Sequence, residues 1–370
     1  MERALARSRD RNQGLPKTKR RIRLMIVDDS VVARAVLSRI VESDNAFEIA
    51  AVASTAEDAL DALSHVRVDI ILLDLEMPGA GGLKSIPQII RAAAGAKIMI
   101  VSSLAEEGAE ATVAALAFGA ADTLPKPGIG RFNGRFSEIL LGKLKSLGQA
   151  IVSDCPPRPA APSGHAGPLR AMPCDPVEVI AIGASTGGIH ALGILFQALP
   201  RKVGVPILVT QHLPHAFMPV FARQLGAVAH REALVAEDGV ELLPDRIIVA
   251  PGDGHLTLDW SSRRLVVRLT RGRSSSGCMP SVDPMFSAVA TAYGCGALGI
   301  VLTGMGRDGV EGAQRLVACG GSILAQDEPS SAVWGMPRAI LDAGLACAVL
   351  PPDKIARRIA SRTEERLTCK

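Results

Sequence analysis

The sequence has no long apolar run. None of its hydrophobic stretches approaches the roughly 18 residues that a membrane helix needs, and runs such as IILL end at acidic residues or glycines. The basic segment 1–23 also has no apolar stretch of the kind that a secretory signal peptide carries. We therefore expect a cytoplasmic protein without direct membrane insertion.

Paired cysteine motifs are absent as well. The seven cysteines are odd in number and scattered, and no two are spaced as CxxC. This pattern argues against a disulfide framework and against a zinc ribbon. It predicts free thiols in a reducing compartment.

Features of a nucleic-acid-binding protein are also missing. The net charge of +4 comes from residues 1–23, which carry nine Lys or Arg and two acidic residues, a net of +7, so the remainder of the chain is at −3. No recognition helix or aromatic stacking motif follows this segment. We interpret residues 1–21 as a disordered basic arm and expect no nucleic-acid partner.

What the chain does contain is enough apolar sequence for two domains. It has 370 residues, of which 48% are hydrophobic. Residues 151–177 include seven prolines and show no apolar period, which indicates an exposed linker. The predicted organisation is the arm at 1–21, a first domain at 22–145, a Pro-rich linker at 146–176 and a second domain at 177–365.

The first domain alternates short apolar runs with helical patterns. The runs IRLMIVDDS, FEIAAVAS, VDIILLDLEMP and AKIMIVSS predict buried strands. Residues 31–43, 56–64, 83–93 and 107–118 have helical spacing. This alternation predicts a parallel sheet with helices on both faces and chemistry at the carboxyl ends of the strands.

Charged and hydroxyl residues lie at those strand ends: Asp28, Asp29, Asp74, Ser102 and Lys126. Three carboxylates at adjoining strand ends repel one another, so we expect a cation among them, and an oxygen-rich pocket suits Mg²⁺. One carboxylate is then available to attack a phosphoryl group. Any single aspartate after a strand is more often a helix cap, but the ordered set favours a site.

The set resembles a response-regulator receiver domain over residues 22–145, which implies a flavodoxin-like fold. The resemblance assigns Asp74 as phosphoacceptor, Asp28, Asp29 and Asp74 as Mg²⁺ ligands, Ser102 as switch hydroxyl and Lys126 as the phosphate-contacting lysine. Many receivers have an aromatic residue where this chain has Thr123. The resemblance therefore does not extend to the usual coupling between the switch hydroxyl and the rotamer of that aromatic side chain.

The second domain resumes the alternation of strands and helices. A doubly wound, mainly parallel α/β domain is predicted from the runs VEVIAIGAS, PILVTQHLP, RIIVAPGDGHL, LGIVLTGMGRDG and SILAQD. The run RLVVRLTR predicts an added hairpin. Residues 183–187 fit G-x-S-x-G, a nucleophile on a strand-to-helix turn, although similar glycine turns bind phosphate. Ser185 needs a base and an orienting acid, for which His212 and Asp308 follow later strands.

Other residues compete for these roles. His255 is a rival base and Asp283 a rival acid, although Asp283 is better explained as a helix cap. His212 and His215 are spaced as two metal ligands, but no third ligand has suitable spacing.

The second domain resembles the catalytic domain of the chemotaxis protein-glutamate methylesterases, the CheB family. The supporting stretches include IAIGASTGG, TQHLPHAFMPVFARQL, PSVDPMF and GIVLTGMGRDG. The resemblance implies a serine hydrolase that demethylates glutamate methyl esters on chemoreceptors and deamidates their glutamines. It assigns Ser185, His212 and Asp308 as the catalytic residues and the N–H groups of Thr186 and Met305 as the oxyanion donors. It implies no cofactor in the catalytic domain. The segment SSSGCM stands where the family commonly has basic residues.

The order of the domains suggests control by occlusion, with the unphosphorylated receiver covering Ser185 until Asp74 is phosphorylated. The expected partners are methyl-accepting chemoreceptors and a chemotaxis-type histidine kinase, and we expect a monomer. Two alternatives are an inactive, phosphorylation-switched docking protein and a DNA-binding response regulator. The intact triad argues against the first, and the glycine-rich, acidic second half argues against the second.

Overall fold

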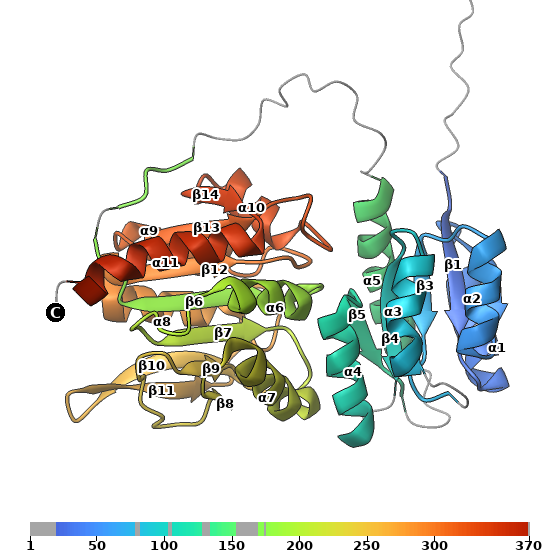
Figure 1. Cartoon of the computed structure of the whole chain (residues 1–370), viewed down its shortest axis with the longest axis horizontal. Helices are drawn as coiled ribbons and strands as arrows, with labels where there is room; N and C mark the ends of the chain where they lie inside the picture. The colour runs from blue at the N-terminus through green and yellow to red at the C-terminus, as the bar shows by residue number, and fades with distance from the viewer. Residues whose placement is uncertain are drawn as a thin grey trace, which may run out of the picture.

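The computed structural model describes residues 20–77, 82–102, 106–127, 134–152, 169–173 and 175–368. Most of the predicted basic arm and the central part of the predicted linker lie outside these residues. Two parallel sheets with flanking helices fill the described part of the chain (Figure 1). The predicted α/β fold class is confirmed.

The first sheet has five parallel strands in the order β2-β1-β3-β4-β5. The strands are β1 (Ile22–Val27), β2 (Phe47–Ala53), β3 (Ile70–Leu73), β4 (Lys97–Ser102) and β5 (Asp122–Pro125). The helices are α1 (Val31–Glu42), α2 (Ala56–His65), α3 (Gly82–Ala92), α4 (Glu106–Phe118) and α5 (Gly134–Val152). This strand order is that of flavodoxin-like domains.

Local sequence explains where these elements begin. Ser30 accepts a hydrogen bond from the N–H of Ala33, and Thr55 accepts one from the N–H of Asp58, so each hydroxyl caps a helix. All four residues of β3 are buried, as expected for a strand covered on both faces. Helices α1 to α4 begin and end within one residue of the predicted ranges.

The predicted end of the first domain at residue 145 lies inside a helix. Helix α5 continues to Val152, because its apolar spacing places Leu140, Leu144 and Leu147 against the sheet. The prolines begin only after this helix, at residue 156. At the other end of the chain, α11 (Pro352–Thr368) extends three residues beyond the predicted boundary at 365.

The second sheet has seven parallel strands in the order β14-β13-β12-β6-β7-β9-β8. The strands are β6 (Val179–Ala184), β7 (Ile207–Gln211), β8 (Ala233–Val235), β9 (Ile247–Val249), β12 (Ala297–Val301), β13 (Ser322–Gln326) and β14 (Ala348–Leu350). The helices are α6 (Gly188–Ala198), α7 (Met218–Ala229), α8 (Val282–Tyr293), α9 (Val310–Ala318), α10 (Met336–Asp342) and α11, with short 3₁₀ turns η1 (His215–Phe217) and η2 (Gly294–Gly296). Strands β10 (His255–Ser261) and β11 (Arg264–Thr270) form the predicted hairpin.

The order of the second sheet determines where a site forms. After β6 the chain moves to β7 and β9, whereas after β12 it moves in the opposite direction to β13 and β14. The crevice at the carboxyl ends of β6 and β12 is therefore the switch point at which such sheets bind their ligands. Ser185 follows β6, and the loop with Met305 and Asp308 follows β12.

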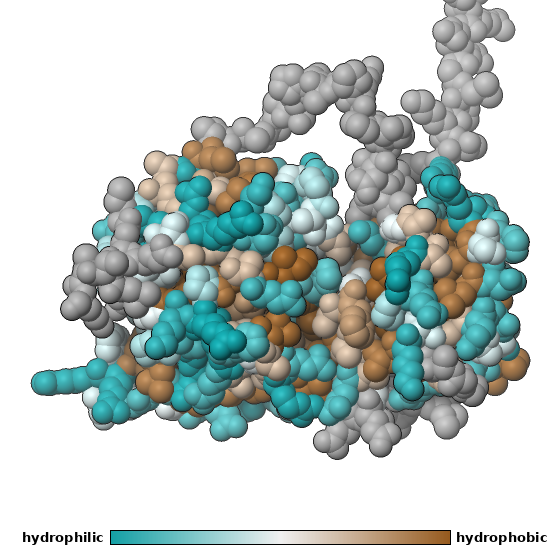
Figure 2. Space-filling view, viewed as in Figure 1, coloured by the Kyte–Doolittle hydropathy of each residue, from teal (hydrophilic) through white to brown (hydrophobic). Residues whose placement is uncertain are grey.

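The first domain packs onto this edge of the second sheet. Helix α4 contacts α6, η1 and α7 (Figure 1). One apolar cluster includes Val113 and Leu116 of α4 together with Ile189 and Leu192 of α6. In the space-filling view the two domains meet without a gap on this face, with apolar surface on both sides of the junction (Figure 2).

None of the helices in the described part of the chain is both long enough and apolar enough to span a bilayer.

Candidate active site and phosphorylation site

Ser185 lies on the turn between β6 and α6. Its N–H donates to the carbonyl of Thr303 at 3.0 Å, which ties the turn to the end of β12. Gly187 has a φ of 77°, a left-handed conformation that turns the chain sharply into α6. A Cβ at Gly304 would lie 2.7 Å from the Cβ of Ser185, so only glycine lets the loop after β12 approach the serine this closely.

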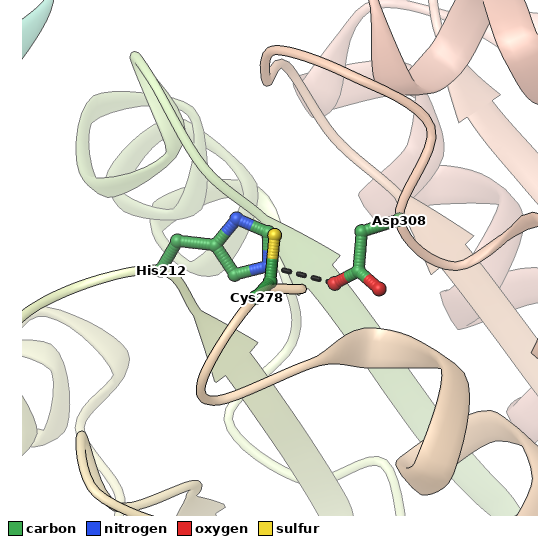
Figure 3. A group of neighbouring side chains, drawn as sticks. All are labelled: His212, Cys278 and Asp308. Atoms are coloured by element: carbon green, nitrogen blue, oxygen red, sulfur yellow. Dashed lines mark hydrogen bonds and ion pairs between the residues drawn. The ribbon is translucent and has the colours of Figure 1, made fainter. Parts of the chain in front are cut away.

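His212 follows β7, and its Nε2 lies 2.7 Å from Oδ2 of Asp308 (Figure 3). Burial alone lowers the pKa of the imidazole, but the hydrogen bond to Asp308 and the neighbouring Cys278 thiol together raise it to about 9. Because Nε2 faces the carboxylate, Nδ1 is the nitrogen left for a proton from Ser185. No hydrogen bond links Ser185 to His212 among the described residues, although both line the same pocket.

Asp308 is 2% exposed and is held from two further directions. The Ser281 hydroxyl donates to Oδ1 at 2.6 Å, and the Val282 N–H donates to Oδ2 at 2.7 Å. Burial raises the pKa of this carboxyl, but the bonds from His212, Ser281 and Val282 lower it far more, so the net shift is downward. Ser281 escaped the sequence analysis, because only the fold brings the start of α8 beside the loop after β12.

Within the described part of the chain, the N–H groups of the two predicted oxyanion donors are free. Neither the Thr186 N–H nor the Met305 N–H donates a hydrogen bond to another described residue. Both groups belong to the loops that flank Ser185, one after β6 and one after β12. Donors without a protein partner at a switch-point crevice are available for a developing oxyanion.

The rivals for the triad have partners of their own. His255 is 2% exposed and uses both ring nitrogens, because Nδ1 accepts the Ser281 N–H and Nε2 lies 2.8 Å from the Gly272 carbonyl. Asp283 does not cap α8 as expected, because Ser281 is at the N-cap and Asp283 lies in the first turn. It accepts the N–H of Gly312 at 2.8 Å and thereby joins α8 to α9. His215 pairs instead with Asp253 at 3.4 Å and belongs to no metal-ligating cluster with His212 among the described residues.

Receiver residues cover the Ser185 pocket. Its walls include Leu116, Ala120 and Asp122 from the receiver and Ser185 and His212 from the second domain, and about 10 Å³ of free volume remains. That is the space of about one water molecule, which leaves no room for a glutamyl ester.

Polar contacts fix the receiver at this position. The Thr186 hydroxyl donates to Oδ2 of Asp122 at 2.6 Å, and the Gly187 N–H donates to the carbonyl of Ala121 at 2.6 Å. Lys143 also contacts Asp122 Oδ2, at 2.7 Å. Asp122 could not be predicted from the sequence, because its partner Thr186 is 64 residues away along the chain.

A thiol lies beside the triad. Cys278 comes from the loop between β11 and α8, and Figure 3 shows its sulfur next to the imidazole of His212. The ligand atoms of His212, Cys278 and Asp308 all lie within 4.8 Å of one another. In the sequence, Cys278 stands out only because it lies where the family commonly has basic residues.

The predicted phosphorylation site also assembles. Asp28, Asp29 and Asp74 place carboxylate oxygens within 4.8 Å of one another, with Asp28 and Asp74 buried and Asp29 exposed. Lys126 Nζ lies 2.7 Å from Asp28 and 2.6 Å from Asp74. Burial raises the pKa of Asp28 although Lys126 opposes the shift. An all-oxygen set open to water on one side fits Mg²⁺.

The predicted switch hydroxyl points to a helix. Ser102 Oγ lies 2.7 Å from the hydroxyl of Thr112 on α4, the helix that contacts the second domain. Thr123, which replaces the usual aromatic residue, is buried, and its hydroxyl has no hydrogen-bond partner among the described residues. The described contacts therefore connect Ser102 to the domain interface through Thr112.

Comparison with known proteins supports both halves of this description. Residues 180–359 match the family model of CheB methylesterase, and residues 24–131 match that of the response regulator receiver domain. The match of the second half to a methylesterase argues against the DNA-binding alternative.

The similarity extends over nearly the whole chain. Protein-glutamate methylesterase/protein-glutamine glutaminase 2 of Caulobacter vibrioides is 41% identical over 344 residues, covering 92% of this chain and 99% of its own. The corresponding protein 1 of Paramagnetospirillum magneticum is 37% identical over 359 residues, covering 90% of this chain and 94% of its own. The crystal structure of the Thermotoga maritima CheB methylesterase catalytic domain aligns with a TM-score of 0.49 at 33% identity, covering 50% of this chain and 98% of that one. The chain belongs to the CheB family of protein-glutamate methylesterase/protein-glutamine glutaminases, in the form in which a receiver precedes the catalytic domain.

Proposed function

We propose that this protein hydrolyses glutamate methyl esters on chemoreceptors and deamidates receptor glutamines, with Ser185 as nucleophile, His212 as base and Asp308 as the orienting acid. The observation that carries the proposal is the placement of Ser185 and His212 in one pocket, with His212 hydrogen-bonded to a buried Asp308. Methanol release from methylated receptors is the direct test of this activity.

In this mechanism the Ser185 hydroxyl attacks the ester carbonyl while Nδ1 of His212 accepts its proton. Asp308 holds the ring through Nε2 and stabilises the imidazolium that forms. The Thr186 and Met305 N–H groups bind the oxyanion, each worth roughly 3 kcal/mol for a donor of this kind. His212 then gives the proton to the departing methoxide, which leaves as methanol, or to the amide nitrogen of a glutamine, which leaves as ammonia. Water attacks the acyl-enzyme with the same base.

The rate of hydrolysis is expected to rise with pH. His212 acts as a base only when it is neutral, and its pKa is raised to about 9, so kcat/KM should rise about tenfold per pH unit until it levels off near that value. Since the Cys278 thiol helps to raise the pKa, Cys278→Ala should move the profile to lower pH. A profile that is flat from about pH 6 upward would contradict this assignment of the base.

In the receiver we propose that Asp74 accepts the phosphoryl group and that Asp28, Asp29 and Asp74 hold Mg²⁺. The ion would neutralise charge on the phosphoryl oxygens when it is bound. Lys126 would follow the transferred group as the second positive charge, and Ser102 would turn from Thr112 toward it. The resulting change at α4 would weaken the interface that covers Ser185.

Phosphorylation should therefore activate the hydrolase. A small phosphodonor with Mg²⁺ is expected to raise demethylation by about five- to 150-fold, the range of a typical coupling free energy. Asp74→Asn should abolish the increase while keeping the basal rate. Asp61→Asn changes an exposed carboxylate on α2 and is the control. Equal stimulation of Asp74→Asn and of the native protein would contradict the assignment.

The proposed partners follow from this reaction. They are methyl-accepting chemoreceptors as substrates and a chemotaxis-type histidine kinase as phosphodonor, which places the protein in the cytoplasm. We propose a monomer, because the contact that covers the active site forms within one chain.

A further inference from the structure

We propose that His212, Cys278 and Asp308 form a binding site for a soft divalent cation, Zn²⁺ in the first instance, and that the ion inhibits the hydrolase by occupying its base. Three separate segments supply the ligands: the end of β7, the loop before α8 and the loop after β12. Figure 3 shows imidazole, thiol and carboxylate converging on one point.

The distances are close to those of a metal site. All three ligand atoms lie within 4.8 Å of one another. Zn²⁺ bonds of about 2.0–2.3 Å place tetrahedral ligand atoms roughly 3.5 Å apart. His212 Nε2 and Asp308 Oδ2, now 2.7 Å apart, would separate by less than about 1 Å to admit the ion.

The loop that carries the thiol is held by its own hydrogen bonds. The Ser274 hydroxyl donates to the Cys278 carbonyl at 2.9 Å, and the Cys278 N–H donates to the Ser276 hydroxyl at 3.3 Å. Gly277, with a φ of 71°, supplies the turn before the cysteine. Cys278 and His212 both remain partly exposed, so an ion can reach them.

The chemistry of the ligands distinguishes this cluster from the one in the receiver. A thiolate and an imidazole favour Zn²⁺ over Mg²⁺, whereas the all-carboxylate set of Asp28, Asp29 and Asp74 favours Mg²⁺. Binding of Zn²⁺ would release the thiol proton to solvent, because the thiolate is the ligand, and below the raised pKa of His212 it would also release the Nε2 proton of the imidazolium. Excess Mg²⁺ should therefore leave the cluster at His212 free for zinc.

Inhibition by Zn²⁺ rests on the proposed role of His212 as base, whereas binding of Zn²⁺ to the three side chains does not. A neutral imidazole has one nitrogen with a lone pair and one that carries hydrogen. An ion on Nε2 takes the lone pair, so Nδ1 carries the hydrogen and no longer accepts a proton from Ser185. The bound ion also separates the His212 ring from Asp308, so the carboxylate no longer orients the ring through a direct hydrogen bond.

Direct binding tests the site without reference to activity. The full-length protein is freed of metal with a chelator and titrated with Zn²⁺ in excess Mg²⁺ against a chromophoric zinc indicator. We expect one Zn²⁺ per chain and at least tenfold weaker binding by Cys278→Ala. Cys295→Ala removes an exposed thiol of the same domain and should bind like the native protein. Co²⁺ should give thiolate-to-cobalt charge-transfer absorption that only Cys278→Ala loses.

Activity then tests the consequence. Zn²⁺ should inhibit methanol release by the native protein and by Cys295→Ala at concentrations at least tenfold lower than those needed for Cys278→Ala, each normalised to its own metal-free rate. Ser185→Ala should bind Zn²⁺ like the native protein, which separates failure of the site from failure of the reaction. Equal zinc affinity of Cys278→Ala and the native protein, equal weakening by Cys295→Ala, or absent charge-transfer absorption would overturn the proposal.

Discussion

Ser185→Ala is expected to lower kcat for methyl ester hydrolysis by about four to six orders of magnitude, as in other serine hydrolases that lose their nucleophile. The hydroxyl at the end of β6 is the group that forms the acyl-enzyme in the proposed mechanism. Without it, water would have to attack the ester directly. Single-turnover release of methanol from a methylated receptor measures the loss, and the thermal midpoint should stay within a few degrees of the native value.

The design of this experiment allows for a second nucleophile. Cys278 also lies beside His212, so a thiol is available there if the serine is not the attacking group. Cys278→Ala is therefore assayed in parallel, and Ser261→Ala, an exposed serine at the end of the β10–β11 hairpin, serves as control. Retention of substantial turnover by Ser185→Ala, combined with its loss in Cys278→Ala, would transfer the role of nucleophile to the cysteine.

Asp122→Ala is expected to raise the basal rate of the unphosphorylated protein by about tenfold or more. Its carboxylate, 12% exposed, receives the Thr186 hydroxyl beside Ser185 and holds the receiver over the pocket. A hydrogen bond to a charged group contributes about 1.5–3 kcal/mol, and 1.4 kcal/mol corresponds to a factor of ten in the open population. Initial rates without phosphodonor measure this change.

A matched substitution separates docking from the folding of the receiver. Asp44→Ala removes a comparable ion pair: Asp44 lies 2.6 Å from Lys145 on α5, the helix that also carries Lys143, and no hydrogen bond joins the Asp44 side chain to the catalytic domain among the described residues. Its basal rate should stay at the native value. Phosphodonor should raise the rate of Asp122→Ala less than that of the native protein, because the pocket is already partly open. An unchanged or lower basal rate in Asp122→Ala would remove this contact from the control of access.

Much of the fold is determined by local sequence. Apolar runs such as IILL and IAIG identified buried strands, and the helical spacing between them set the parallel order of both sheets. Residues that follow parallel strands of one sheet meet at its carboxyl edge, so the carboxylates of Asp28 and Asp74, and the pair His212 and Asp308, could be predicted to come together. The short strands β8 and β14 were not predicted, whereas β9, which also has three residues, lies within the run RIIVAPGDGHL and was.

The tertiary structure alone decided the contacts between loop residues that are far apart in the sequence and belong to no periodic pattern. His255 was a rival base until its two ring nitrogens were found bonded to Ser281 and Gly272. The Ser281 hydroxyl on Asp308 and the thiol of Cys278 beside His212 likewise depend on how the loop before α8 folds. A single residue in a loop carries no periodic signal, so its partner is set only by packing.

Docking of the receiver is the clearest example. The sequence determined that a receiver domain, a linker and a hydrolase follow one another and which residues carry their chemistry. It did not determine that Asp122 lies on Thr186 or that α4 covers the serine. Strand and helix patterns arise from neighbours along the chain, whereas an interface between two finished domains depends on the shape and charge of surfaces that exist only after each domain has folded.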